Sequence, residues 1–211
     1  MHLINSLKWR YATKTFDPSK KVSVQDLDLL KEAVQLTASS YGLQPYKILV
    51  IENPSLRAQL KPVSWGQSQI TDASHLFVFC NYTSVGQDDV NQYLKLKADA
   101  QSVEFSSMKG YADFIMNKLS EKSQTYQQQW TAKQTYIALG NLLAACGELE
   151  IDACPIEGFD NAAYDNLLQL NDKGLTSAVV VAVGYRSNTD TNQKQPKVRK
   201  PLELLFETID G

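Results

Sequence analysis

The chain contains 211 residues, of which 43% are hydrophobic and 21% are charged, and its formal net charge is −2. These values are ordinary for a globular domain and exclude disordered and collagen-like chains. We expect one domain, residues 1–211, long enough to bury a sizeable core. The near-neutral charge predicts no nucleic-acid partner. No apolar run approaches the roughly 18 residues of a membrane-spanning helix. Lys8 and Arg10 lie where a signal peptide would need its apolar stretch. We therefore expect a cytoplasmic protein with no membrane partner.

The first 82 residues predict three helices and two strands. Helices are indicated by apolar residues at helical spacing, by capping residues and by proline breaks, and strands by continuous apolar runs. In chain order the predicted elements are a short helix at 3–7, a helix from 23 to about 37 opened by Ser23 and Asp26, a strand at 46–51, a short helix at 53–61 and a strand at 76–82.

The second half predicts mainly helices. Residues 88 to about 121 are polar with helical propensity, and Gly110 is expected to divide them. A helix at about 125–149 is apolar over much of its circumference, which indicates burial. A helix at 161–170, a strand at 177–185, a polar stretch at 186–201 and an apolar tail at 202–209 follow. The tail is either a strand or an arm reaching elsewhere. Strands separated by helices predict a layered α/β or α+β protein.

Small residues recur on the long helix at Gly140, Ala144 and Gly147. Glycine inside a helix costs up to about 1 kcal/mol relative to alanine, so a packing gain is expected to offset it. The stripe fits an internal core contact and a subunit seam equally well.

Cysteine and histidine offer little chemistry. The odd number of cysteines (Cys80, Cys146 and Cys154) and the lack of a CxxC pair argue against a disulfide framework and a zinc site, so we expect no metal. Packing is the favoured role for Cys146 and Cys154. His75 precedes a buried strand and is interpreted as structural rather than catalytic. The chain also lacks GxGxxG and P-loop patterns.

Two basic clusters lie near opposite ends of the chain, RYATK at 10–14 and KVRK at 197–200. If the fold joins them, they form an anion site, because arginine offers a planar fork and lysine a point charge to phosphate oxygens. The alternative is charge that only faces solvent. Other candidates are the hydroxyls of Ser39 and Ser40, the amides of Gln67 and Gln69, and a rigid Pro-x-x-Gly loop at 154–159.

Six segments in this order resemble the FMN-dependent nitroreductase family, most closely its oxygen-insensitive NAD(P)H nitroreductase and dihydropteridine reductase branch. They are RYATKTF at 10–16, SSYGLQP at 39–45, DASH at 72–75, WTAKQTY at 130–136, PIEGF at 155–159 and PKVRKP at 196–201. The resemblance implies an α+β, three-layer α/β/α fold with a central, mostly antiparallel sheet. It also implies a domain-swapped homodimer with two FMN sites at an interface of long helices, and a tail, about 196–211, that reaches the partner subunit.

The resemblance also implies roles for individual residues. Arg10, Lys197 and Arg199 would hold the FMN phosphate, with Tyr11 and Ala12 beside it. Lys14 would lie at the N1 and O2 edge of the flavin, where a cation stabilises the reduced form. Ser39 and Gln69 would contact the flavin, with Ser40 and Gly66 nearby. The segment Pro155, Ile156, Glu157 and Gly158 would pass along the ring, with the backbone N–H groups of Glu157 and Gly158 facing N5 and O4. No side chain is expected to act as acid or base, since the cofactor carries the chemistry.

The sequence departs from the family at several of these positions. Tyr11 and Ala12 stand where close relatives carry His and Ser, Gly66 stands for Asn, and Gln69 for Lys. Residues 87–124, which would cover the substrate channel, match poorly. The candidates there for gating side chains are Tyr111, Phe114 and Met116.

The resemblance implies an NAD(P)H-dependent oxidoreductase that reduces nitroaromatics, quinones or related small molecules in a ping-pong cycle through flavin N5. No residue that reads the ribose 2′ position is identifiable, so NADH and NADPH are both candidate donors. The alternatives are an FMN-binding relative that stores or breaks down flavin, and a non-enzymatic dimeric interaction protein.

Overall fold

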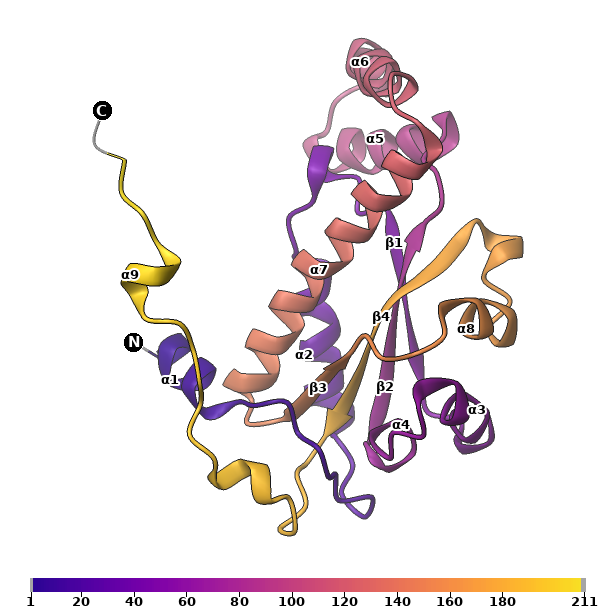
Figure 1. Ribbon diagram of the computed structural model, residues 1–211. Helices are drawn as coiled ribbons and strands as arrows, with labels where there is room; N and C mark the ends of the chain where they lie inside the picture. Colours follow the sequence, from indigo (N-terminus) through magenta and orange to yellow (C-terminus); the bar gives the residue numbers. More distant parts are fainter. Residues whose placement is uncertain (1, 210–211) are drawn as a thin grey trace.

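A four-stranded antiparallel sheet lies between two layers of helices in the computed structural model, which describes residues 2–209 (Figure 1). The strands are β1 (Tyr46–Ile51), β2 (His75–Tyr82), β3 (Asp152–Ile156) and β4 (Leu175–Gly184). The helices are α1 (His2–Trp9), α2 (Val24–Gln35), α3 (Pro54–Leu60), α4 (Gln69–Asp72), α5 (Gln87–Gln101), α6 (Lys109–Ser120), α7 (Gln124–Glu148), α8 (Asn161–Leu167) and α9 (Leu202–Leu205). Short 3₁₀ turns are η1 (Ser40–Gly42), η2 (Pro62–Ser64), η3 (Phe105–Met108), η4 (Asn171–Lys173) and η5 (Thr191–Lys194).

The strand order is β1-β2-β4-β3, so β1 and β3 lie at the two edges. The prediction of a loop from Cys154 was wrong, because Cys154, Pro155 and Ile156 belong to β3 and pair with β4. Proline lacks a backbone N–H and is tolerated in a sheet at an edge strand. The five-residue strand also begins with a buried aspartate, Asp152, so no apolar run announces it.

The sheet has a core on each face. Along β2, Leu76 and Val78 pack toward α3, α4 and α8, whereas Phe77 and Phe79 pack toward α2 and α7. Because both faces are covered, the strand is apolar at successive positions rather than alternate ones. The predicted three-layer α+β architecture is thereby confirmed.

Helix boundaries follow the predicted signals. The Ser23 hydroxyl accepts the backbone N–H of Asp26 at 3.0 Å and caps α2. The side chain of Asn53 caps α3 in the same way, with Pro54 in its first turn. The predicted break at Gly110 was wrong: α5 ends before Ser102, which has a φ of 53°, and Gly110 lies inside α6.

The small residues of the predicted stripe on the long helix α7 have different surroundings. A Cβ on Gly147 would lie 3.1 Å from the Ser6 carbonyl oxygen, so Gly147 admits α1 closely. A Cβ on Gly140 would meet nothing within 4 Å, and Gly140 is exposed. The stripe therefore contains one internal contact at Gly147 and an open face at Gly140.

The helix α1 and the segment 202–209 lie on the same side of the molecule (Figure 1). The predicted strand or arm at 202–209 begins as the short helix α9, and residues 202–209 are exposed throughout. Figure 1 shows this segment leaving the body of the protein beside α1. No helix within residues 2–209 has the length and apolar character required to cross a membrane.

Candidate functional site

The two basic clusters meet at one cavity of about 500 Å³, between the segment that follows α1 and the segment that follows η5. This arrangement brings together residues nearly 190 positions apart in the sequence, such as Lys197 and Arg10, which are in contact. The lining residues are Lys8, Trp9, Arg10, Tyr11, Ala12, Leu143, Pro155, Asn192, Gln193, Gln195, Pro196, Lys197 and Arg199.

The cavity is cationic. Its lining includes Arg10, Lys197 and Arg199 and contains no aspartate or glutamate. Burial lowers the pKa of Lys197, and the positive charges of Arg10 and Arg199 lower it further. The pKa of Arg10 is also lowered, first by burial, with Arg199 adding to the effect. Within the described part of the chain, the buried Arg10 Nε has no hydrogen-bond partner. The three cationic groups thus repel one another, and the buried Arg10 Nε lacks an acceptor. A bound anion would offset the repulsion and accept a hydrogen bond from Arg10 Nε.

Lys197 also ties the tail segment to the end of α1. Its Nζ donates to the backbone carbonyl oxygens of Leu7 and Arg10. A cation at the C-terminal end of a helix is favourable, because the last carbonyl groups lack helical partners and carry partial negative charge. The contact holds one wall of the cavity against the other.

Asp190 fixes the loop that carries Tyr11 and Lys14. Its Oδ2 accepts the Tyr11 hydroxyl at 3.0 Å and the backbone N–H groups of Lys14 and Thr15 at 2.8 and 3.1 Å. Asp190 is only 1% exposed. Burial alone would raise its pKa, but the backbone donors of Thr15, Lys14 and Asn192 outweigh burial and lower the pKa to about 2. The carboxylate is therefore ionised at neutral pH.

A second buried carboxylate, Asp152 at the start of β3, supports the other side of this segment. It accepts the Thr13 hydroxyl at 3.0 Å and the backbone N–H and Nε of Arg186 at 2.8 and 2.9 Å. The Arg186 guanidinium in turn lies 4.2 Å from the Trp9 ring centroid and 4.7 Å from that of Tyr11. Cation–π contacts of this kind order the aromatic rings beside the cavity.

Lys14 and Gln69 lie close to β3. Burial raises the pKa of the Cys154 thiol, while the charges of Lys14 and Arg10 and a hydrogen bond from Gln69 oppose the shift. These three predicted site residues therefore lie near enough to Cys154 to act on its thiol, and Cys154 is followed by Pro155 of the cavity lining. Ile156, also predicted to pass along the flavin, is buried in the core between the sheet and α8.

The predicted ring-binding segment continues from β3 to Glu157 and Gly158. The Tyr136 hydroxyl of α7 donates to Glu157 Oε1 at 2.6 Å, and burial together with this bond raises the Tyr136 pKa to about 12. The Trp65 ring covers Gly158 so closely that a Cβ there would lie 2.5 Å from a ring carbon. Gln67 Nε2 donates to the Gly158 carbonyl at 2.9 Å, which joins the two loops.

Gly66 follows Trp65 in this loop. It has a φ of 70°, where glycine is favoured, and a Cβ there would meet nothing within 4 Å. Gly66 is therefore exposed, with open space where a side chain would stand.

The site extends along α7. Leu143 lines the cationic cavity, and Tyr136 contacts Glu157 at 2.6 Å. These two helical residues are seven positions apart, which corresponds to about 10 Å along the helix. The fold thus places the cationic cavity and the Tyr136–Glu157 contact at two levels along the same helix.

Ser39 and Ser40 are not brought to this site within the chain. The Ser39 hydroxyl accepts the backbone N–H of Gln44, and the Ser40 N–H donates to Gln134 Oε1 at 2.9 Å. Gln134 precedes Leu143 of the cavity by nine residues, or about 14 Å along α7. The two serines therefore lie beside the middle of that helix, away from the cationic cavity.

The predicted gating side chains belong to α6. The Tyr111 and Phe114 rings stack with centroids 6.3 Å apart, and Phe114 meets the edge of Tyr41 at 6.4 Å. Tyr41 also contacts Trp130 of α7 at 6.1 Å. Met116 packs against the small core of α5 and α6. The aromatic group thus connects the η1 turn, beside the two serines, to α6 and α7.

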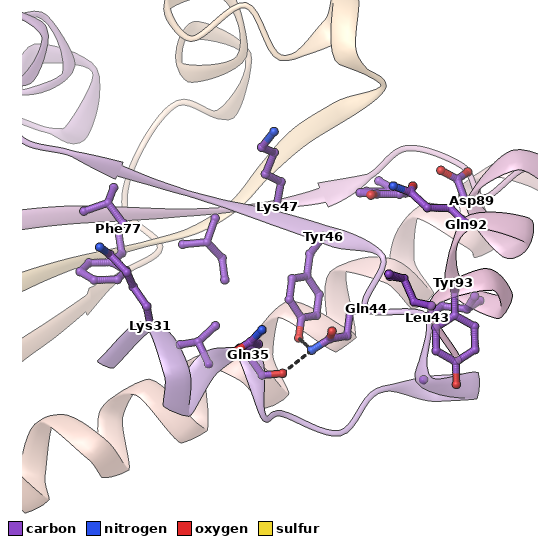
Figure 2. A pocket seen from close by; sticks show the side chains of 16 residues that line it. Lys31, Gln35, Leu43, Gln44, Tyr46, Lys47, Phe77, Asp89, Gln92 and Tyr93 are labelled. Atoms are coloured by element: carbon purple, nitrogen blue, oxygen red, sulfur yellow. Dashed lines mark hydrogen bonds between the residues drawn. The ribbon is translucent and has the colours of Figure 1, made fainter. Parts of the chain in front are cut away.

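A second cavity, of about 560 Å³, lies beside the edge strand β1, between α2 and α5. Figure 2 shows the Gln44 side chain between Tyr46 and Gln35, where its Nε2 donates to the backbone carbonyl of Gln35 at 2.8 Å and to the Tyr46 hydroxyl at 3.3 Å. The amino groups of Lys31 and Lys47 reach outward from it (Figure 2). We call this feature the β1 groove. None of the predicted site residues lines it.

Sequence reasoning missed Asp152, Asp190, Trp65 and Tyr136. Asp190 lies in a polar stretch without periodicity, and its donors are about 175 residues away. Trp65 offered a weak signal, because a large aromatic before a glycine in a loop is unusual. Tyr136 belongs to the long helix whose apolar circumference indicated burial, but it is 42% exposed and contacts Glu157.

A family profile and individual known proteins match the chain over most or all of its length. The profile of the Nitroreductase family matches residues 7–185. The oxygen-insensitive NAD(P)H nitroreductase of Salmonella typhimurium is 35% identical, over 99% of this chain and 100% of that protein. The major NAD(P)H-flavin oxidoreductase of Aliivibrio fischeri is also 35% identical, over 95% of each chain.

Solved structures share the fold. A protein of Exiguobacterium sibiricum, solved in complex with FMN, superposes with a TM-score of 0.82 at 16% identity, over 98% of this chain and 97% of that one. A nitroreductase family protein of Streptococcus pneumoniae gives a TM-score of 0.83 at 20% identity, over 98% and 99% of the two chains. By its sequence over nearly the whole length, and by its fold, the chain belongs to the nitroreductase family.

Proposed function

We propose that this protein is an FMN-dependent oxidoreductase that takes electrons from NADH or NADPH and delivers them to nitroaromatics, quinones or related small acceptors. The observation that carries the proposal is the cationic cavity built from both ends of the chain, with the buried, unpartnered Arg10 Nε inside it. Relatives at 35% identity are named NAD(P)H nitroreductase and NAD(P)H-flavin oxidoreductase, which supports the same chemistry.

The residues present fit FMN. A phosphate would satisfy Arg10 Nε and offset the mutual repulsion of Arg10, Lys197 and Arg199. Lys14 and Gln69, beside Cys154, would then reach the flavin, and Glu157 and Gly158 would present backbone N–H groups to it. Tyr11 would form an aromatic wall of the cavity, and Ala12, which has no hydroxyl, would leave room beside the phosphate. Bound FMN would supply the hydride transfer between nicotinamide and acceptor, and this chain supplies its binding and orientation.

We further propose that the working unit is a homodimer, with α7 at the subunit interface. Tyr136, Ile137 and Gly140 leave one face of this long helix exposed. Ser39 and Ser40 lie about 14 Å along α7 from the cationic cavity, so they would contact the flavin in the site of the second copy. Two equivalent sites then follow from two-fold symmetry.

The tail is the proposed arm between subunits. Residues 202–209 expose Leu202, Leu204, Leu205 and Phe206 at 61–73%. The β1 groove is lined by apolar side chains such as Leu43, Ile48 and Val50 together with polar ones. Its charged residues are Lys31, Lys47 and Asp89, and the two lysines complement Glu203 and Glu207 of the tail. We infer that the tail of one copy occupies the β1 groove of the other.

The proposed function is tested by a visible spectrum of the purified protein, followed by anaerobic addition of NADH and then NADPH. Flavin bands that bleach on addition support the oxidoreductase, and the faster donor is the preferred one. Flavin bands that persist favour a storage or breakdown role for bound flavin. Protein that stays colourless after incubation with FMN contradicts both flavin functions and leaves a dimeric interaction protein.

A further inference from the structure

The segments that supply the proposed phosphate site are far apart in sequence, and backbone bonds join them only up to a point. Asp17 N–H donates to the Tyr185 carbonyl at 2.8 Å, and Ser187 N–H donates to the Thr15 carbonyl at 2.9 Å. Beyond Ser187 the chain turns away from the sheet, and the cationic residues follow 10 to 12 positions later. Lys197 itself donates to the Leu7 and Arg10 carbonyls, but this exposed contact does not fix the turn that leads into Lys197 and Arg199.

Asp190 contacts both segments. Its Oδ2 binds Tyr11, Lys14 and Thr15, which follow Arg10 in the chain. Its Oδ1 accepts the backbone N–H and the Nδ2 of Asn192 at 2.9 and 3.1 Å, which caps η5. η5 leads through Gln195 and Pro196 directly into Lys197. One buried carboxylate therefore holds the loop after Arg10 and the turn before Lys197 at the same time.

We propose that Asp190 is a positioning residue that aligns the two basic segments, 10–15 and 191–199, into one phosphate site. The inference rests on the proposed FMN function and assigns a role to a residue outside the cavity lining. The ionised carboxylate suits this position because it only accepts hydrogen bonds, and all five groups that contact it are donors. An asparagine side chain would turn an NH₂ group toward at least one set of these donors and lose their bonds.

The test compares Asp190→Asn with Asp165→Asn, a matched control. Asp165 is also buried and accepts the Ser177 N–H at 2.8 Å and the Ser177 and Thr176 hydroxyls at 2.8 and 2.6 Å. It lies in α8, on the opposite side of the sheet from α7. Both substitutions remove a carboxylate that accepts several buried donors, but only Asp190 is connected to the cationic cavity.

The first measurement is the dissociation constant of FMN and of riboflavin, by quenching of flavin fluorescence in full-length protein freed of flavin. Riboflavin lacks the phosphate. Asp190→Asn is expected to weaken FMN binding by at least tenfold and riboflavin binding by less than threefold, while Asp165→Asn leaves the FMN-to-riboflavin preference unchanged. If Asp190→Asn weakens both ligands equally, or neither, the positioning role is overturned.

The second measurement is amide hydrogen exchange at Lys14 and Thr15 in the ligand-free protein. We expect exchange at least tenfold faster in Asp190→Ala than in the wild type and in Asp165→Ala, because alanine offers no acceptor to either amide. Unchanged exchange would overturn the inference without reference to flavin. Wild-type protein that binds no FMN would instead contradict the proposed function, and the exchange result would still decide whether Asp190 aligns the two segments.

Discussion

Replacing Arg199 by alanine separates a binding role for the cationic cavity from a structural one. Arg199 is exposed, and its Nη1 donates only to the neighbouring Val198 carbonyl at 2.6 Å within the described residues. Its charge lowers the pKa of Lys197 and of Arg10, so it costs the ligand-free protein free energy. A hydrogen bond from an exposed guanidinium to phosphate is worth about 1.5 kcal/mol, which is roughly tenfold in Kd.

Arg199→Ala is therefore expected to weaken FMN binding about tenfold while leaving the ligand-free free energy of unfolding unchanged or slightly higher. Fluorescence titration with FMN at low and high salt, together with urea unfolding, measures both quantities. The difference in Kd should shrink at high salt, because ions screen exposed charges. Lys200→Ala is the control, since Lys200 is exposed and does not line the cavity. Equal FMN affinity in the two variants would refute a phosphate role for Arg199.

Three other predictions concern acid stability and assembly. The pKa of Asp190 in the fold, about 2, lies below its ordinary value of 3.8. The ionised carboxylate therefore stabilises the fold by about 2 kcal/mol well above pH 4, and this stabilisation is lost as the pH falls toward 2. In urea unfolding, the difference in free energy of unfolding between the wild type and Asp190→Asn should roughly halve between pH 6 and pH 3, and a constant difference would contradict the assignment. Gly140→Ala should weaken dimerisation in sedimentation equilibrium, despite a gain in helix propensity. Gly147→Ala should instead lower the unfolding temperature, because the added Cβ would meet Ser6. A Gly140→Ala variant that is more stable and dimerises as well as the wild type would show that Gly140 is not part of the subunit interface. Deleting 202–211 should give a monomer by the same method, and an intact dimer would rule out the tail as the arm.

The parts of the fold that sequence predicted are those set by local pattern. The apolar runs of β1, β2 and β4, the Ser23 cap and the long α7 each depend on residues within one element. β3 was missed because Pro155 and Asp152 are acceptable there only at a sheet edge and beside Arg186. Such tolerance is a property of the assembled sheet and leaves no local signal.

The same distinction applies to the site. The basic segments were visible as clusters, but charge alone does not tell a surface from a cavity. Their meeting point depends on Asp190, whose carboxylate is unremarkable in sequence and is defined by donors at Tyr11 and Lys14. The positions of Ser39 and Ser40, beside the middle of α7, could not be inferred without the helix that separates these serines from the cationic cavity.

The long sequence separation within the cationic cavity has a consequence for synthesis of the protein on the ribosome. The sheet is complete once Gly184 has emerged, since β4 is its last strand. The cavity needs a further 15 residues, up to Arg199, to leave the exit tunnel before its two walls can meet. At roughly 5–20 residues per second, the nascent chain passes through an interval in which the core is formed but the proposed FMN phosphate site is not. Cofactor binding is then a post-folding event, and it acts as a check that the C-terminal segment has been made.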